Sequence, residues 1–392
     1  SEPAALGCMS ILLFLPPLFE HSLRTEGTVF YALFAVSSLL LLIKSRRSAW
    51  LFLPAVVLAG LAQLTRQDGL LVVLVLFVSA WLAPWPKKTK VRYTLLGLLV
   101  YVATLSPIMA VNYRTIGSPF PPSTAKTLFL TNYEDLYAYS KELTPGSYLG
   151  SGIAGILRSK ARMALANAYT LFTNWGQFLS IFTVLGAVIL VRRRRGGAGL
   201  GIWLPPALLL AAFYVFYTLV IGFGSSFDRS SLAVAPFVVI LVVLTITRLI
   251  PTGMSAAIIA LLTAWFFFQS VQLARLNIKA DARMDRDLME VKAIAANDAA
   301  ARGRDNIVIM TRDPWDVYQS TRYKAIQIPN DGLEVICEVA RRYGADYLLL
   351  PAPRQALDDI YTGKRSDDRF PFVACIPYSD LKLFRIELDE RE

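Results

Sequence analysis

The sequence predicts a multi-spanning α-helical membrane protein, with about nine spanning helices in residues 1–272 and a small soluble α/β domain in residues 273–392. Of its 392 residues, 55% are hydrophobic and 18% are charged, whereas about a quarter are charged in a typical soluble domain. Long apolar runs fill the chain up to about Gln272, and apolar and charged residues alternate after it. Composition and its distribution therefore predict two domains in different solvents.

Each expected spanning helix corresponds to one apolar run, most of them close to the length that crosses a bilayer. Pro16 and Pro17 break the first run, and a four-residue polar turn, 65–68, separates the third from the fourth as in a tight helical hairpin. The runs lie near residues 4–19, 27–43, 49–64, 69–85, 93–111, 174–191, 201–222, 231–248 and 254–272.

The net charge of +11 is better explained by membrane topology than by a nucleic-acid partner, because no nucleic-acid recognition motif accompanies it. Basic residues gather at 44–47, 87–92 and 192–195, between apolar runs, as in cytoplasmic loops. Placing these clusters inside puts Arg248 inside as well, and leaves 20–26, 65–68, 112–173, 223–230 and everything after residue 272 outside. The sequence thus predicts a multi-pass plasma-membrane protein of the cell envelope whose C-terminal domain is extracytoplasmic.

Two further regions have recognisable patterns. In the long outer loop 112–173, residues 151–170 have the spacing of an amphipathic interfacial helix, with Arg158, Lys160 and Arg162 available to lipid headgroups. The C-terminal domain is expected to contain helices at 281–301 and 333–343 and strands at 306–310, 344–350, 372–376 and 381–386. No glycine-rich phosphate loop follows its first two strands, so no nucleotide is assigned to it.

Metal and disulfide chemistry have little support in the sequence. His21 is the only histidine, and Cys8, Cys337 and Cys375 form no CxxC pair. A His/Cys zinc site is therefore not expected. A disulfide between Cys337 and Cys375 is left open by their spacing.

Candidate functional residues gather in the three short outer loops, each of which carries an arginine within two residues of a carboxylate. Such residues can simply close helix ends by pairing with one another. Ionisable groups at membrane depth are costly, however, and often mark a binding site. The residues are Glu20, His21, Arg24 and Glu26 in the first loop, Arg66 and Asp68 in the second, and Asp228 and Arg229 in the third.

Arginines beside carboxylates suit the transfer of a sugar from a lipid-linked phosphate. The forked guanidinium group stabilises the charge of a phosphate leaving group, and a carboxylate can act as general base toward an acceptor hydroxyl. Because the isoprenoid tail of such a donor lies in the bilayer, the reaction must occur at headgroup level, where these loops are expected.

Several motifs also resemble, in their order, the C-type membrane glycosyltransferases, which include protein O-mannosyltransferases and the lipid A aminoarabinose transferase. The resemblance spans nearly the whole chain. It rests on Leu23-Arg24-Thr25-Glu26, on 60–70 (GLAQLTRQDGL), on Gly117-Ser118-Pro119-Phe120 with the Tyr133-Glu134-Asp135 segment, on 224–230 (GSSFDRS) before Pro236, and on 343–349 (YGADYLL).

The resemblance implies an inverting bacterial transferase that moves a sugar from a polyprenyl-phosphate donor to a glycan, lipid or protein acceptor. It implies donor-phosphate or substrate contacts for Glu26, Arg66, Asp68 and Arg229. The outer-loop residues Arg24, His21 and Asp228 are further binding candidates. No resident cofactor is assigned, and a divalent-metal requirement is left open.

The catalytic carboxylate is not assigned. The resembled family carries it in an outer loop that has no counterpart here, so we expect further chain upstream of Ser1 and donor binding without transfer by residues 1–392. Asp68 and Glu26 are the nearest candidates for the base, although an adjacent arginine makes each a poorer one. Two other classes of function compete: a transporter or lipid flippase, which would need midplane charges and repeated segments, and a noncatalytic membrane subunit.

Overall fold

The computed structural model describes residues 2–24, 26–120, 127–130, 133–175, 178–192, 200–220, 226–352, 354, 356–377 and 379–388. The chain divides into two compact units. The first contains Ser1–Tyr133 and Leu143–Ala274, and the second contains Glu134–Glu142 and Arg275–Glu392. We describe each unit separately.

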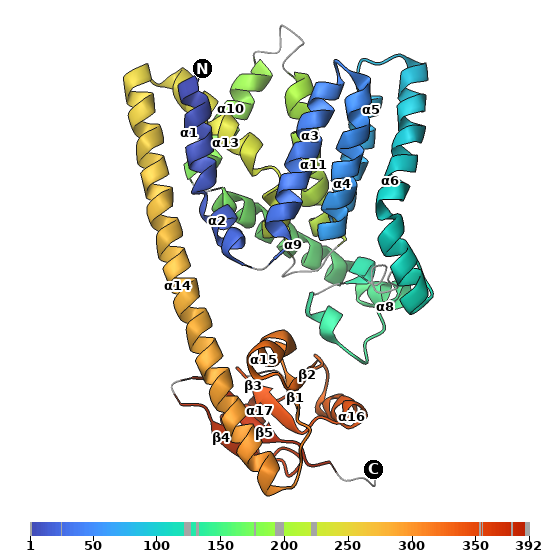
Figure 1. Cartoon of the computed structure of the whole chain (residues 1–392), viewed down its shortest axis with the longest axis vertical. Helices are drawn as coiled ribbons and strands as arrows, with labels where there is room; N and C mark the ends of the chain where they lie inside the picture. Colours follow the sequence, from blue (N-terminus) through green and yellow to red (C-terminus); the bar gives the residue numbers. More distant parts are fainter. Residues whose placement is uncertain are drawn as a thin grey trace. The chain divides into compact units, whose positions relative to one another are not determined.

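The first unit is a bundle of α-helices (Figure 1). Apolar residues dominate most of these helices, and turns that contain Pro, Gly or charged residues separate them. The helices are α1 (Glu2–Leu13), α2 (Pro16–Leu23), α3 (Thr28–Ser45), α4 (Phe52–Thr65), α5 (Gly69–Trp81), α6 (Lys87–Ile116), α8 (Pro145–Gly150), α9 (Gly152–Asn174), α10 (Phe178–Arg192), α11 (Leu200–Leu219), α12 (Phe227–Ser231), α13 (Ala235–Leu249) and the first part of α14 (Thr252–Ala301).

Four helices of the described chain, α3, α6, α11 and α14, are long and apolar enough to cross a membrane. The number rises to six if the bent pairs α1 with α2 and α9 with α10 each count as one span. Three further apolar helices, α4, α5 and α13, are shorter. The expected class is confirmed as a set of apolar helices suited to a membrane, whereas the expected number of about nine spans is not established.

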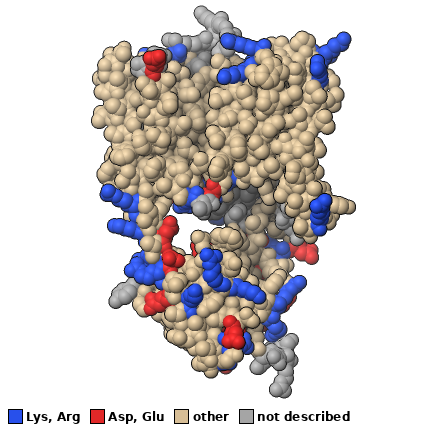
Figure 2. Space-filling model, in the orientation of Figure 1, with Lys and Arg blue, Asp and Glu red and all other residues tan. Residues whose placement is uncertain are grey.

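The surface of the first unit supports a membrane environment. Leu95 and Leu99 on α6 are 63% and 67% exposed, and Leu261 on α14 is 69% exposed. Large contiguous apolar surfaces are rare on water-soluble proteins. On the face seen in Figure 2, the Lys, Arg, Asp and Glu side chains of this unit lie at its two ends, and the middle of the helices has none. The exposed middle is therefore suited to lipid.

Two sequence expectations about helices are confirmed, the break at the proline pair and a helix at 151–170, although this helix continues to Asn174. Pro16 and Pro17 occupy the first positions of α2, and α2 is bent by 50° from α1, because proline cannot continue the preceding hydrogen-bond ladder. The amphipathic stretch expected at 151–170 is α9, with Met163 and Asn167 buried and Leu157 exposed. Lys160, expected to reach lipid headgroups, is buried, and its Nζ lies 3.5 Å from the carbonyl oxygen of Leu130.

The second unit contains a five-stranded sheet of order β2-β1-β3-β5-β4. The first three strands in this order are parallel, and β5 pairs antiparallel with both β3 and β4. The elements are β1 (Val308–Thr311), α15 (Pro314–Thr321), β2 (Lys324–Gln327), α16 (Leu333–Tyr343), β3 (Tyr347–Leu350), α17 (Asp358–Thr362), β4 (Phe372–Cys375) and β5 (Lys382–Arg385).

Helices cover both faces of this sheet. Ile336 and Ala340 of α16 pack with Met310 and Leu348 on one face. On the other face, Val291 of α14 and residues of α15 pack against alternate residues of the same strands, such as Ile309. Strand residues alternate between faces, so one short strand contributes to two cores. The expected α/β arrangement is confirmed, although the sequence analysis did not anticipate α15, β2 and α17.

The last apolar segment does not end at Gln272, where the apolar composition ends. Residues 252–301 form one continuous 50-residue helix, and no proline or glycine occurs in it after Gly253. The change in composition therefore marks a change of surroundings along one helix, and the two units divide between Ala274 and Arg275.

A short piece of the expected outer loop belongs to the second unit. The carboxylate of Asp331 accepts hydrogen bonds from the backbone N–H groups of Tyr139 and Ser140, at 2.5 and 3.2 Å. The backbone N–H of Asn330 donates to the carbonyl of Tyr137 at 2.9 Å. Residues 134–142 are thereby attached to the segment that connects β2 with α16.

Candidate functional site

The described parts of the three short loops meet at one end of the helix bundle. In Figure 1, the connections α2–α3 and α4–α5 lie at the same end, and ion pairs and hydrogen bonds join them to α12. We call this group the turn cluster: Glu20, His21, Arg24, Glu26, Tyr31, Arg66, Asp68, Tyr217, Asp228, Arg229 and Ser230. Thr25 and the motif residues Gly224 and Ser225 lie outside the described residues, as do arginines 193–195 of the third basic cluster.

The buried part of the turn cluster is organised around Asp68, whose side chain is 6% exposed. Its Oδ1 accepts a hydrogen bond from Nε of Arg66 at 3.1 Å. Its Oδ2 accepts one from the hydroxyl of Tyr217 at 3.0 Å and another from Ser230. One carboxylate thus ties the α4–α5 turn to α11 and α12.

The Arg66 side chain, which is bonded to Asp68, has further contacts in the turn cluster. Its Nη2 lies 3.4 Å from Oγ of Ser230, and its Cζ lies 5.6 Å from the ring centroid of the fully buried Tyr31. Burial alone would lower the pKa of the Arg66 guanidinium, but the charge and hydrogen bond of Asp68 outweigh it and keep that pKa above the ordinary value. Arg66 is therefore a cation with most of its donors occupied.

The more accessible part of the turn cluster surrounds Glu26. Its Oε2 lies 3.2 Å from Nη1 of Arg229 and 3.3 Å from Nδ1 of His21. The contact with His21 lacks hydrogen-bond geometry, and this nitrogen has no hydrogen-bond partner in the described chain. Arg24 contacts Glu26 at 3.8 Å and forms a closer ion pair with Glu20. Arg229 and Arg24 are 34% and 43% exposed, so their guanidinium groups can reach a ligand.

Asp228 has a different environment from its neighbours. Its backbone carbonyl accepts hydrogen bonds from Nδ2 of Asn174 and Oγ of Ser231, at 3.0 and 2.8 Å. Its half-buried carboxylate forms no ion pair with any described residue, because Arg229 pairs with Glu26 from another turn. Asp228 is thus a carboxylate without a cationic partner in the described part of the chain.

Four residues of this arrangement were not anticipated as functional. Tyr31 and Tyr217 lie inside apolar runs, where an aromatic residue gives no signal of a polar contact. Asn174 follows the amphipathic stretch. Ser230 ends the 224–230 motif, and its position one turn after Ser226 in a short helix was the available signal.

Metal ligands are sparse in the described residues, where no group of three or more His, Cys, Asp or Glu side chains could hold an ion. Cys337 and Cys375, whose pairing the sequence left open, are both free thiols, as is Cys8.

No protein-family model matches the chain, and no match to it was found among curated proteins or solved structures.

The α4–α5 turn has little room for change at Gly69, the residue after Asp68. A Cβ atom there would lie 2.4 Å from the backbone nitrogen of Gln63 and 2.5 Å from its Cα. Because these are backbone atoms, the turn would have to move. We expect Gly69→Ala to lower the thermal midpoint of the purified protein by several degrees, as for other overpacking substitutions that cost about 1–3 kcal/mol. Gly150→Ala, where a Cβ meets nothing within 4 Å, is the control, and equal midpoints would contradict the prediction.

Proposed function

We propose that this protein is an integral membrane glycosyltransferase that uses a polyprenyl-phosphate-linked sugar as donor, with the turn cluster as the donor-phosphate site. The observation that carries the proposal is the meeting of three separate turns in one group of arginines and carboxylates at the end of an apolar bundle. A lipid-linked phosphate would have its tail among apolar helices and its charge at this level.

The roles within the proposed site differ with accessibility. Arg229 and Arg24 contact the donor phosphate, because their side chains, 34% and 43% exposed, are the more accessible arginines of the turn cluster. Arg66 and Asp68 position the turns, since Asp68 is buried, the Arg66 side chain is only 16% exposed, and the two are bonded to each other. Glu26 and Asp228 are carboxylates beside this phosphate position that could receive the proton of an acceptor hydroxyl.

Transport is the main competing function. A transporter needs a polar path through the midplane. The helices α3, α4, α5, α11 and α13 carry no Asp, Glu, Lys or Arg except Lys44 and Arg248, which lie in last turns. A noncatalytic subunit would bind the donor without consuming it. Incubating reconstituted protein with radiolabelled polyprenyl-phosphate sugar and a membrane extract as acceptor source tests this. Release of polyprenyl phosphate would support sugar transfer, and donor moved across the bilayer would support transport. Intact donor on the same side is the result expected both of a noncatalytic subunit and of donor binding without transfer.

The proposed orientation predicts which residues a membrane-impermeant thiol reagent reaches in intact cells. In a Cys8→Ser, Cys337→Ala, Cys375→Ser background, a cysteine at Ser366 in the C-terminal unit should be labelled. One at Ser48, between α3 and α4 in a basic loop, should stay unlabelled until the cells are broken. The reverse pattern would place the turn cluster on the cytoplasmic side and would remove the basis for an extracytoplasmic donor site.

A further inference from the structure

The second unit has a pocket at the carboxyl ends of its three parallel strands. Its volume is about 160 Å³. Arg312 directly follows β1, Ile328 directly follows β2 and Pro351 directly follows β3. The other lining residues are Glu134, Asn330, Leu350, Ala352 and Arg354. All of these residues belong to the second unit.

The strand order makes this edge a topological switch point. From β1, the middle one of the three parallel strands, the chain crosses through α15 to β2 on one side. From β2 it crosses through α16 to β3 on the other side of β1. The two connecting helices lie on opposite faces of the sheet. Such connections diverge at the central strand and leave a crevice at the carboxyl ends, where open parallel sheets bind their ligands. The pocket occupies that place.

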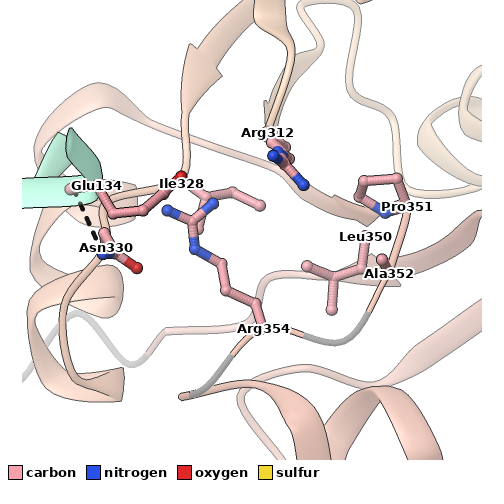
Figure 3. A pocket seen from close by; sticks show the side chains of 8 residues that line it. All are labelled: Glu134, Arg312, Ile328, Asn330, Leu350, Pro351, Ala352 and Arg354. Atoms are coloured by element: carbon pink, nitrogen blue, oxygen red, sulfur yellow. Dashed lines mark hydrogen bonds between the residues drawn. The ribbon is translucent and has the colours of Figure 1, made fainter. Parts of the chain in front are cut away.

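The chemistry of the pocket favours an anion. Figure 3 shows Arg312 and Arg354 on different walls of the pocket, with Glu134 and Asn330 at one side and Pro351 and Ala352 at the other. Among the residues that the structure describes, neither guanidinium forms a hydrogen bond or an ion pair within 4 Å. Seven of the thirteen described arginines of this unit do have such partners, for example Arg304 with Asp346 and Arg369 with Asp367.

The positive charge of Arg354 is only partly compensated by its surroundings. Burial lowers the pKa of the Arg354 guanidinium, the positive charge of Arg312 lowers it further, and Glu134, Asp313 and Asp331 offset this only in part. Asp331 is occupied by the backbone of 139–140, and Asp313 precedes α15. A bound dianion would offset the free-energy cost of burying the Arg354 charge. It would also reduce the repulsion between Arg354 and Arg312.

We propose that this pocket binds a phosphate group, as a phosphomonoester or inorganic phosphate, between Arg312 and Arg354. Two guanidinium groups match the charge of a phosphate dianion, and their planar donors suit its oxygens. The residues 134–142 attach to the β2–α16 connection and supply Glu134 as part of the wall. This site is separate from the turn cluster and does not depend on sugar transfer.

The test is calorimetric titration of the full chain, in uncharged detergent and 150 mM salt, with inorganic phosphate. Saturable binding is expected, about tenfold weaker in Arg354→Ala or Arg312→Ala and undetectable in the double variant. Glu134→Gln should tighten binding about threefold, since it removes a negative charge from the wall. The matched control is Arg341→Ala, in the last turn of α16, which removes the same charge outside the pocket.

The outcomes are distinct. No saturable binding, or equal weakening in Arg341→Ala, would overturn the proposal, and unchanged thermal midpoints in the arginine variants would show that they fold. Repeating the titration in nanodiscs of phosphatidylcholine with and without phosphatidic acid identifies the source of the phosphate. Competition by phosphatidic acid indicates a lipid headgroup, and its absence indicates a soluble phosphate; either result supports the site.

Discussion

Replacing Asp68 with alanine is expected to destabilise the helical unit by about 3–5 kcal/mol, the cost of leaving one partner of a buried ion pair uncompensated. The variant would leave the largely buried guanidinium of Arg66 without its carboxylate, and the hydroxyl of Tyr217 would keep only Ser230, 2.8 Å away, as a hydrogen-bond partner. Tryptophan fluorescence during heating in detergent should then report a midpoint lower by roughly 10 °C.

Two companion variants separate charge from packing. Asp68→Asn keeps an acceptor for Tyr217 and should fall between the wild type and Asp68→Ala. The double variant Arg66→Met, Asp68→Leu removes both charges and should recover most of the loss, because apolar replacement of a buried pair is often nearly neutral. If the double variant were less stable than Asp68→Ala, the charges of Arg66 and Asp68 would not compensate each other, and the prediction would be wrong.

Replacing Arg229 with alanine is expected to weaken binding of a polyprenyl-phosphate sugar about tenfold or more, as for loss of a charge-assisted hydrogen bond. Arg229→Lys should restore only part of the affinity, because a point charge cannot bind bidentately. Binding can be followed by microscale thermophoresis with a fluorescent short-chain donor.

The control for this prediction is Arg248→Ala, which removes an exposed arginine from the last turn of α13, outside the turn cluster. It should leave donor affinity unchanged. Arg66→Ala should also weaken binding, but together with a lower thermal midpoint, since Arg66 forms hydrogen bonds with Asp68 and Ser230. Unchanged donor affinity in Arg229→Ala would reduce Arg229 to a surface ion pair with Glu26.

Features that follow from a local sequence pattern could be predicted. The proline pair at 16–17 predicted a break, and the apolar spacing of 333–343 predicted α16 with the same bounds. The membrane character follows from composition, because uninterrupted apolar runs have few other structures open to them. Helix lengths and compositions support four to six membrane crossings in the described chain. The nine apolar runs counted in the sequence are more numerous than these crossings.

Contacts between distant segments could not be predicted from the sequence. Asp68 and Ser230 are 162 positions apart and meet only because α5, α11 and α12 pack together. Arg229 follows Asp228 directly in the sequence, yet it pairs with Glu26 from another turn. The strand β2, whose sequence is KAIQ, is too short and too polar to be recognised alone, and without it neither the switch point nor the pocket can be foreseen.

The most direct test of the central claim compares polyprenyl phosphate with polyprenol of the same chain length, by native mass spectrometry of the purified protein released from detergent. Both share the isoprenoid tail, and only the first carries the charge that the turn cluster is proposed to bind. The account predicts a one-to-one adduct with polyprenyl phosphate that is at least tenfold more abundant than with polyprenol, and that falls to the polyprenol level in Arg229→Ala. Equal adducts for the two lipids in the wild-type protein would contradict it.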